Sequence, residues 1–126
     1  MEDKSREWLR QAEYDMNTAE FMFGGGRYFY AVFMCHLSIE KVLKGLYYEK
    51  RKELPPKVHN LLYFLNKIGL MPPEPLARFI VKLNEANIAT RYPENLDELQ
   101  KNYTEQVVKE IISKSMEVLA WIKEQF

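Results

Sequence analysis

The 126-residue sequence has no excess charge of either sign and almost no cysteine. Eighteen basic side chains balance eighteen acidic ones, so there is no overall positive field to attract phosphate backbones, and nucleic acid is not an expected partner. The single cysteine, Cys35, excludes an internal disulfide and is typical of a reducing compartment. Because Cys35 lies among Ala31, Val32 and Ile39, we expect it to be a small core residue.

Long hydrophobic runs are also missing. The longest uninterrupted apolar stretch, residues 29–35, is far shorter than the ~20 residues that span a bilayer. The chain opens with a charged segment, residues 2–7, which is unlike a signal peptide. We therefore expect a cytoplasmic protein that does not associate with a membrane.

Metal-ligating patterns are absent as well. One cysteine and two distant histidines, His36 and His59, do not form a zinc-ligand pattern. Neither histidine follows a glutamate by three residues, as the ligands of di-metal helical bundles do. The glycine run at residues 24–26 follows a helical pattern and predicts a helix end, not a phosphate-binding loop. We expect no metal and no cofactor.

What the sequence does contain is helical periodicity over most of its length. Apolar residues recur at helical spacing in five segments, and no stretch alternates as a strand would. The predicted helices cover residues 5–23, 28–50, 58–68, about 76–91 and 104–126, with Ser5 and Thr104 as N-caps and residues 93–102 as a loop. The fold class is therefore predicted to be all-α, an up-and-down antiparallel helical bundle of about five helices that forms a single domain over residues 1–126.

The second predicted helix carries a set of polar side chains on an otherwise apolar surface. His36, Glu40 and Lys44 follow one another at four-residue spacing, and Lys41 lies on the flank of this line. Charged groups are costly to bury unless they are paired. Two interpretations stay open: these groups form ion pairs where helices meet, or they face a ligand.

Three further positions could complete this set. Asp15 lies beside the apolar stripe of the first helix, where it either pairs with a cation of the facing helix or lies at the solvent boundary. His59 lies near the start of the third helix, where backbone amides favour anions. Arg91 ends a polar stripe that also contains Asn84 and Asn87, and its guanidinium could bind phosphate or carboxylate.

The charges are distributed unevenly along the chain. Residues 41–57 contain six basic and two acidic side chains, whereas residues 84–105 contain two basic and five acidic ones. Such a dipolar molecule suits a complementary partner or self-association. The alternative is that both regions are simply solvated surfaces.

Four segments together resemble the HEPN family (higher eukaryotes and prokaryotes nucleotide-binding domain). They are Trp8-Leu9-x-x-Ala12-x-x-Asp15-x-x-x-Ala19, His36-x-x-x-Glu40-Lys41-x-x-Lys44, His59 with Leu61 and Leu62, and Arg91-Tyr92-Pro93. The resemblance implies a helical bundle that usually forms a homodimer. It also implies a partner protein, a minimal nucleotidyltransferase, with which such domains form toxin–antitoxin-like pairs, and a nucleotide as a possible ligand.

The sequence departs from this family at one important point. Many members are metal-independent ribonucleases in which a histidine follows an arginine after four to six residues, but no histidine follows Arg91. A non-catalytic binding module is therefore expected, and its candidate ligand-binding residues are His36, Glu40, Lys41, Lys44, His59, Arg91, Tyr92 and Asp15. The resemblance also implies that Tyr92 could accept a nucleotidyl group. The alternative is an atypical ribonuclease that uses His36 or His59 with Arg91.

Overall fold

The computed structural model describes all residues, 1–126, as six α-helices with no strand. The all-α prediction is confirmed, and the helix count is six where about five were predicted. In chain order the helices are α1 (Asp3–Gly24), α2 (Tyr28–Arg51), α3 (Leu61–Ile68), α4 (Glu74–Arg91), α5 (Leu96–Asn102) and α6 (Glu105–Lys123).

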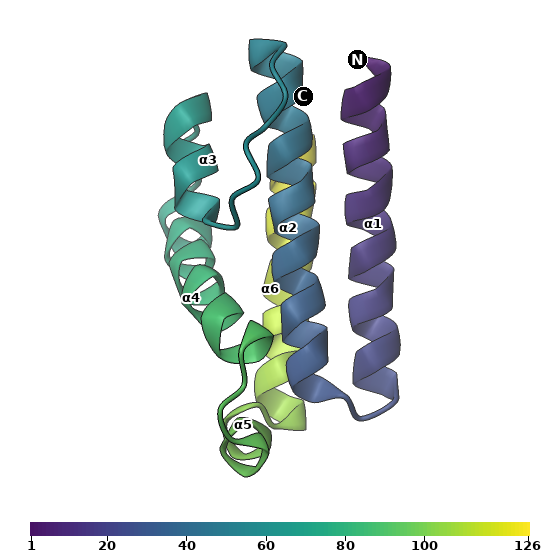
Figure 1. Ribbon diagram of the computed structural model, residues 1–126, viewed down its shortest axis with the longest axis vertical. Helices are drawn as coiled ribbons and strands as arrows, with labels where there is room; N and C mark the ends of the chain where they lie inside the picture. Colours follow the sequence, from purple (N-terminus) through teal and green to yellow (C-terminus); the bar gives the residue numbers. More distant parts are fainter.

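The helices form an up-and-down bundle around α2 (Figure 1). The helix α1 lies on one side of α2, α3 and α4 lie on the other side, and α6 lies behind it. The chain runs along α1, returns along α2, runs back through α3 and α4, and returns along α6, so both termini lie at the same end of the bundle. The short helix α5 closes the opposite end.

The central position of α2 follows from its sequence, which is apolar over most of its circumference. Its buried residues include Val32, Ile39 and Leu43, which belong to the main hydrophobic core. Cys35 is fully buried in the same core, as predicted, and burial raises the pKa of its thiol to about 12. The protonated thiol is a packing group and not a nucleophile.

A close contact fixes the distance between α1 and α2. A Cβ atom on Gly45 would lie 2.9 Å from the Cβ atom of Trp8 and 3.3 Å from the backbone oxygen of Ser5. Only glycine leaves room for α1 at this point. Ser5, which we predicted as an N-cap, is instead buried inside α1, whose N-cap is Glu2.

The sixth helix, α5, lies within the segment predicted as a loop. Asn95 accepts a hydrogen bond from the backbone N–H of Glu98 and caps this helix, and Leu99 is buried. The polar composition of the segment concealed a helix of only seven residues. The predicted cap Thr104 is confirmed, because its hydroxyl accepts a hydrogen bond from the N–H of Val107. The end of α4 at Arg91 is confirmed as well.

The start of α3 also differs from the prediction. The helix begins at Leu61, three residues later than expected, because the side chain of Asn60 accepts hydrogen bonds from the N–H groups of Leu62 and Tyr63. None of the six helices combines the length and apolar character that crossing a membrane requires.

Candidate functional site

The polar side chains of α2 point to two different neighbours. On the α1 side, the Lys41 ammonium lies 2.9 Å from a carboxylate oxygen of Asp15, which is almost fully buried. One turn earlier along α2, the Ser38 hydroxyl donates a 2.6 Å hydrogen bond to the backbone oxygen of Ala12. Of the two interpretations of Asp15, the structure contains the ion pair between helices.

Glu40 is the centre of the polar groups on the other side of α2. One of its carboxylate oxygens lies 2.9 Å from the Lys44 ammonium, and the other lies 2.9 Å from Nδ1 of His59. The Lys44 ammonium also lies 5.8 Å from the ring centre of Trp8 and 5.9 Å from that of Phe64. Because His59 belongs to the connection between α2 and α3, its contact with Glu40 holds this connection against α2.

His36 is fully buried one turn before Glu40. Its Nδ1 atom lies 3.8 Å from Glu40, too far for a hydrogen bond, and neither ring nitrogen has a hydrogen-bond partner. The pKa of His36 is lowered to about 4, mainly by burial; the charge of Glu40 opposes this shift, and the charge of Arg91 adds to it. The imidazole is therefore neutral near neutral pH.

Two asparagines connect α4 to the start of α3. The side-chain oxygen of Asn84 accepts a 2.8 Å hydrogen bond from the N–H of Leu61, and its amide donates to Asn60 over 3.2 Å. Asn60 was not among the sequence candidates, although an asparagine directly before an apolar run is a usual N-cap signal. These bonds fix the position of α4 relative to the start of α3, which follows His59 in the chain.

Arg91, the last residue of α4, lies over the ring of Phe33 from α2. The guanidinium carbon is 4.8 Å from the ring centre, and Nε donates a 3.3 Å hydrogen bond to Asn87. The Nη2 atom is buried and has no hydrogen-bond partner. The sequence did not single out Phe33, although it lies three residues before His36 and so on a neighbouring part of the same helix face.

The structure divides the predicted set into three parts. His36, Glu40, Lys44 and His59 lie together, and Arg91 is near enough to lower the pKa of His36. Asp15 and Lys41 form a separate pair towards α1. Tyr92 follows α4 and is 70% exposed. No three or more histidine, cysteine, aspartate or glutamate side chains come together in a way that could hold a metal ion.

Comparison with known proteins gives one family and two similar structures. The family model described as HEPN domain matches residues 5–125. The crystal structure of TT1696 from Thermus thermophilus is 26% identical with a TM-score of 0.84, and the match covers 99% of this chain and 100% of that one. The crystal structure of ST0689, an archaeal HEPN homologue, is 26% identical with a TM-score of 0.77 over 98% of both chains. No curated protein matches the sequence.

Proposed function

Since the chain belongs to the HEPN domain family, we propose that it is a binding module, a homodimer that pairs with a minimal nucleotidyltransferase and binds a nucleotide through Arg91. The pair would act in the manner of a toxin and antitoxin, as the family resemblance implies. This proposal assigns the remaining polar groups of α2 mainly to holding the bundle together.

One observation carries the assignment to Arg91. Among the five predicted basic side chains, His36, Lys41, Lys44 and His59 each lie within 4.0 Å of a carboxylate. Arg91 takes part in none of the ion pairs in the structure, and its buried Nη2 is unpaired. A buried N–H without a partner costs about 1–3 kcal/mol. Because Arg91 as a whole is only partly buried, a rotation of its guanidinium would bring Nη2 to a phosphate oxygen and recover this cost.

The surroundings of Arg91 suit a nucleotide. The guanidinium presents a planar set of donors that matches a phosphate, and the Phe33 ring beneath holds this plane in place. Tyr92 offers an exposed aromatic ring directly after it. In contrast, Lys41 and Lys44 would have to leave their carboxylates to reach a ligand.

Binding is favoured over cleavage because of the state of the histidines. A general base needs a pKa near the working pH and access to its substrate. His36 is fully buried with a pKa lowered to about 4. No histidine follows Arg91 in the sequence, so the arginine–histidine pairing of the family's ribonucleases is missing.

Calorimetric titration with ATP and other nucleotides tests the nucleotide-binding proposal. We expect saturable binding to the wild-type protein and a loss of at least tenfold in affinity for Arg91→Ala, because a charged hydrogen-bond donor contributes about 1.5–3 kcal/mol. Arg10→Ala is the matched control, since Arg10 lies on the exposed surface of α1. Equal binding by Arg91→Ala and wild type, or no saturable binding to any nucleotide, would exclude the assignment.

The homodimer is supported by exposed apolar side chains near the same end of the bundle. Ile88 and Tyr92, which lie four residues apart, are 68% and 70% exposed. Tyr30 and Leu96, 48% and 56% exposed, line a common pocket between the start of α2 and α5. Apolar surface of this kind is typical of an interface, and a second copy of the chain would cover it with the same surface.

Sedimentation analysis of Ile88→Glu tests the dimer. We expect a concentration-dependent dimer for wild type and a monomer for the variant, because the introduced carboxylate would be desolvated in the interface. Phe21→Glu is the control, since Phe21 is equally exposed but lies on α1. A wild-type monomer, or a dimer that survives in Ile88→Glu, argues against this surface.

The partner enzyme is tested through Tyr92. In the proposed reaction, the Tyr92 hydroxyl oxygen forms a bond to the α-phosphorus of ATP, supplied by the nucleotidyltransferase, and pyrophosphate leaves. Co-expression with a minimal nucleotidyltransferase should yield a complex and a mass increase of one nucleotidyl group that is absent from Tyr92→Phe. If co-expression yields no complex and no adduct, the pairing is wrong.

A second function, an atypical metal-independent ribonuclease, is favoured by the contact between His59 and Glu40. A carboxylate 2.9 Å from Nδ1 of a half-exposed imidazole orients the ring. RNA cleavage in EDTA that disappears in both His59→Gln and Arg91→Ala would establish this function in place of the binding module. Cleavage that persists in both variants would exclude it.

A further inference from the structure

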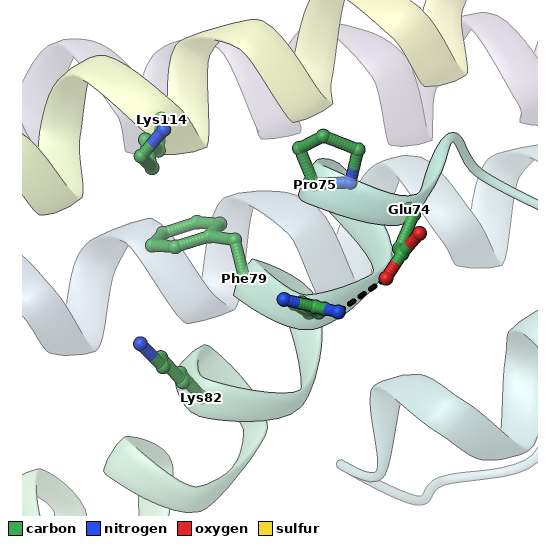
Figure 2. A pocket seen from close by; sticks show the side chains of 6 residues that line it. Glu74, Pro75, Phe79, Lys82 and Lys114 are labelled. Atoms are coloured by element: carbon green, nitrogen blue, oxygen red, sulfur yellow. Dashed lines mark hydrogen bonds and ion pairs between the residues drawn. The ribbon is translucent and has the colours of Figure 1, made fainter.

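A groove between α4 and α6 lies outside the site described above. Its floor consists of Phe79, Leu83 and Ile111, and Val107 continues it along α6. Lys82 from α4 and Lys114 from α6 flank the floor. Figure 2 shows the ring of Phe79 between these two lysines. We call this surface the α4–α6 groove; it shares no residue with the polar set around α2.

The cationic end of the α4–α6 groove is incompletely neutralised. Arg78 pairs with Glu74, but neither Lys82 nor Lys114 takes part in any ion pair. Arg78 and Lys82 are four residues apart on α4, a spacing at which like charges repel. The protein tolerates this repulsion in a chain with no net charge. An anionic group placed between Lys82 and Lys114 would give both ammonium groups the partner that they lack.

The other end of the α4–α6 groove is apolar. Leu83, Ala86, Val107 and Ile111 line it, and Val107 is 42% exposed. One carboxylate, Glu110, also borders this end, where it accepts a hydrogen bond from Gln106 of the same helix. With Arg78 paired to Glu74, the two lysines outnumber Glu110, so the groove combines an apolar strip with a margin of net positive charge. A ligand that matches it has apolar groups and carboxylates in the same order.

The length of the α4–α6 groove indicates which kind of ligand with apolar groups and carboxylates fits it. The groove follows α4 from Pro75 to Ala86, which corresponds to about 16 Å at the helical rise of 1.5 Å per residue. An amphipathic helix of three turns has this length, and recognition of such a helix by a groove between two helices is common. A stacked base is less suitable, because the only aromatic ring of the groove, Phe79, is 7% exposed.

We propose that the α4–α6 groove docks a short acidic amphipathic segment of a partner protein. Its apolar side chains lie on Leu83, Ala86 and Ile111, and its carboxylates lie at Lys82 and Lys114. This inference does not rest on the proposed function. The proposal can hold even if Arg91 binds no nucleotide, and its failure would not affect the assignment of Arg91.

The test uses a fluorescein-labelled amphipathic peptide of about 12 residues, three helical turns, with leucine on one face and glutamate beside it. Fluorescence anisotropy should give saturable binding to the wild-type protein. The double variant Lys82→Glu/Lys114→Glu should bind about tenfold more weakly or worse, because repulsion replaces attraction at both margins. Ala86→Trp, which fills the apolar end and keeps both lysines, should weaken binding to a similar extent.

A matched control separates the groove from general charge attraction. Lys57→Glu/Lys101→Glu changes the net charge equally at exposed positions outside the groove and should bind within about twofold of wild type, because distant surface charges are screened by salt. In NMR spectra the peptide should shift the amide signals of Leu83, Ala86 and Ile111.

Four results of the binding experiments would overturn the proposal. They are absence of saturable binding, an equal loss in both double variants, equal binding of a peptide in which serine replaces leucine, and tighter binding of a single-stranded oligonucleotide that displaces the peptide. Amide shifts confined to other helices would overturn it as well.

Discussion

Polar side chains on the two sides of α2 differ in how completely they are paired. Towards α1, Lys41 and Asp15 neutralise each other, Ser38 is bonded to Ala12, and Gly45 lets the backbones approach. Towards α3 and α4, Glu40 contacts both Lys44 and His59, whereas both ring nitrogens of His36 and one nitrogen of Arg91 lack a hydrogen-bond partner. On the α1 side the charges are paired, although the buried Ser5 hydroxyl has no hydrogen-bond partner. On the other side a histidine and an arginine keep unpaired nitrogens, and it is the arginine to which we assign a ligand.

The largest difference in stability between the two sides of α2 is expected from removing the carboxylate of Glu40, which several groups contact. Glu40→Ala leaves the buried ammonium of Lys44 without its partner, so we expect the free energy of unfolding to fall by about 3–5 kcal/mol in urea denaturation. The control Glu74→Ala breaks an exposed pair with Arg78 and should cost less than about 1 kcal/mol. Equal losses in the free energy of unfolding would mean that Glu40 stabilises the fold no more than an exposed ion pair does.

A pH series isolates the unpaired imidazole on the same side of α2. The pKa of His36 is lowered to about 4 in the folded protein, so between this pH and about 6.5 the unfolded chain binds a proton that the folded one does not. Its contribution to stability is complete above pH 6.5 and is lost as the pH falls towards 4, by about 3 kcal/mol.

The measurement compares wild type with His36→Leu by chemical denaturation at each pH. Subtracting the two curves removes the titration of the other groups near His36, namely Glu40, His59 and Arg91. A difference curve that stays flat between pH 7 and pH 4 would show that the pKa of His36 is the same in the folded and unfolded states.

A smaller effect is expected on the α1 side. Gly45→Ala places a methyl group 2.9 Å from the Cβ atom of Trp8, which cannot move without α1, so we expect a loss of about 1–3 kcal/mol in thermal or urea unfolding. The control Gly24→Ala meets no atom within 4 Å at the end of α1 and should be neutral or stabilising by up to about 1 kcal/mol. A neutral Gly45→Ala would mean that the contact between α1 and α2 is looser than described.

The sequence predicted the parts of this comparison that depend on helical spacing. The line of His36, Glu40 and Lys44 follows from a four-residue period. The place of Asp15 beside the apolar stripe allowed an ion pair with the second helix but equally allowed the solvent boundary, and the structure contains the ion pair. The end of α4 at Arg91 follows from the proline two residues later.

What could not be predicted depends on which helices meet and at what height. Spacing alone does not say that Lys41 faces Asp15 while Lys44 faces Glu40, because each lysine has several carboxylates within possible reach. The stacking of Arg91 on Phe33 joins two residues 58 positions apart in the sequence. The helix α5 was missed although Asn95 and Leu99 carry cap and core signals, because the surrounding composition is polar.

The central claim is that the unpaired Arg91 binds a ligand, whereas the paired Lys41 holds two helices together. Calorimetric titration of one nucleotide against Arg91→Ala and Lys41→Met, at a temperature where both variants are folded, tests it most directly. We predict that Arg91→Ala loses at least tenfold in affinity and that Lys41→Met binds like wild type, because only the former removes a free phosphate donor. Loss of binding in Lys41→Met with unchanged binding in Arg91→Ala would contradict the account.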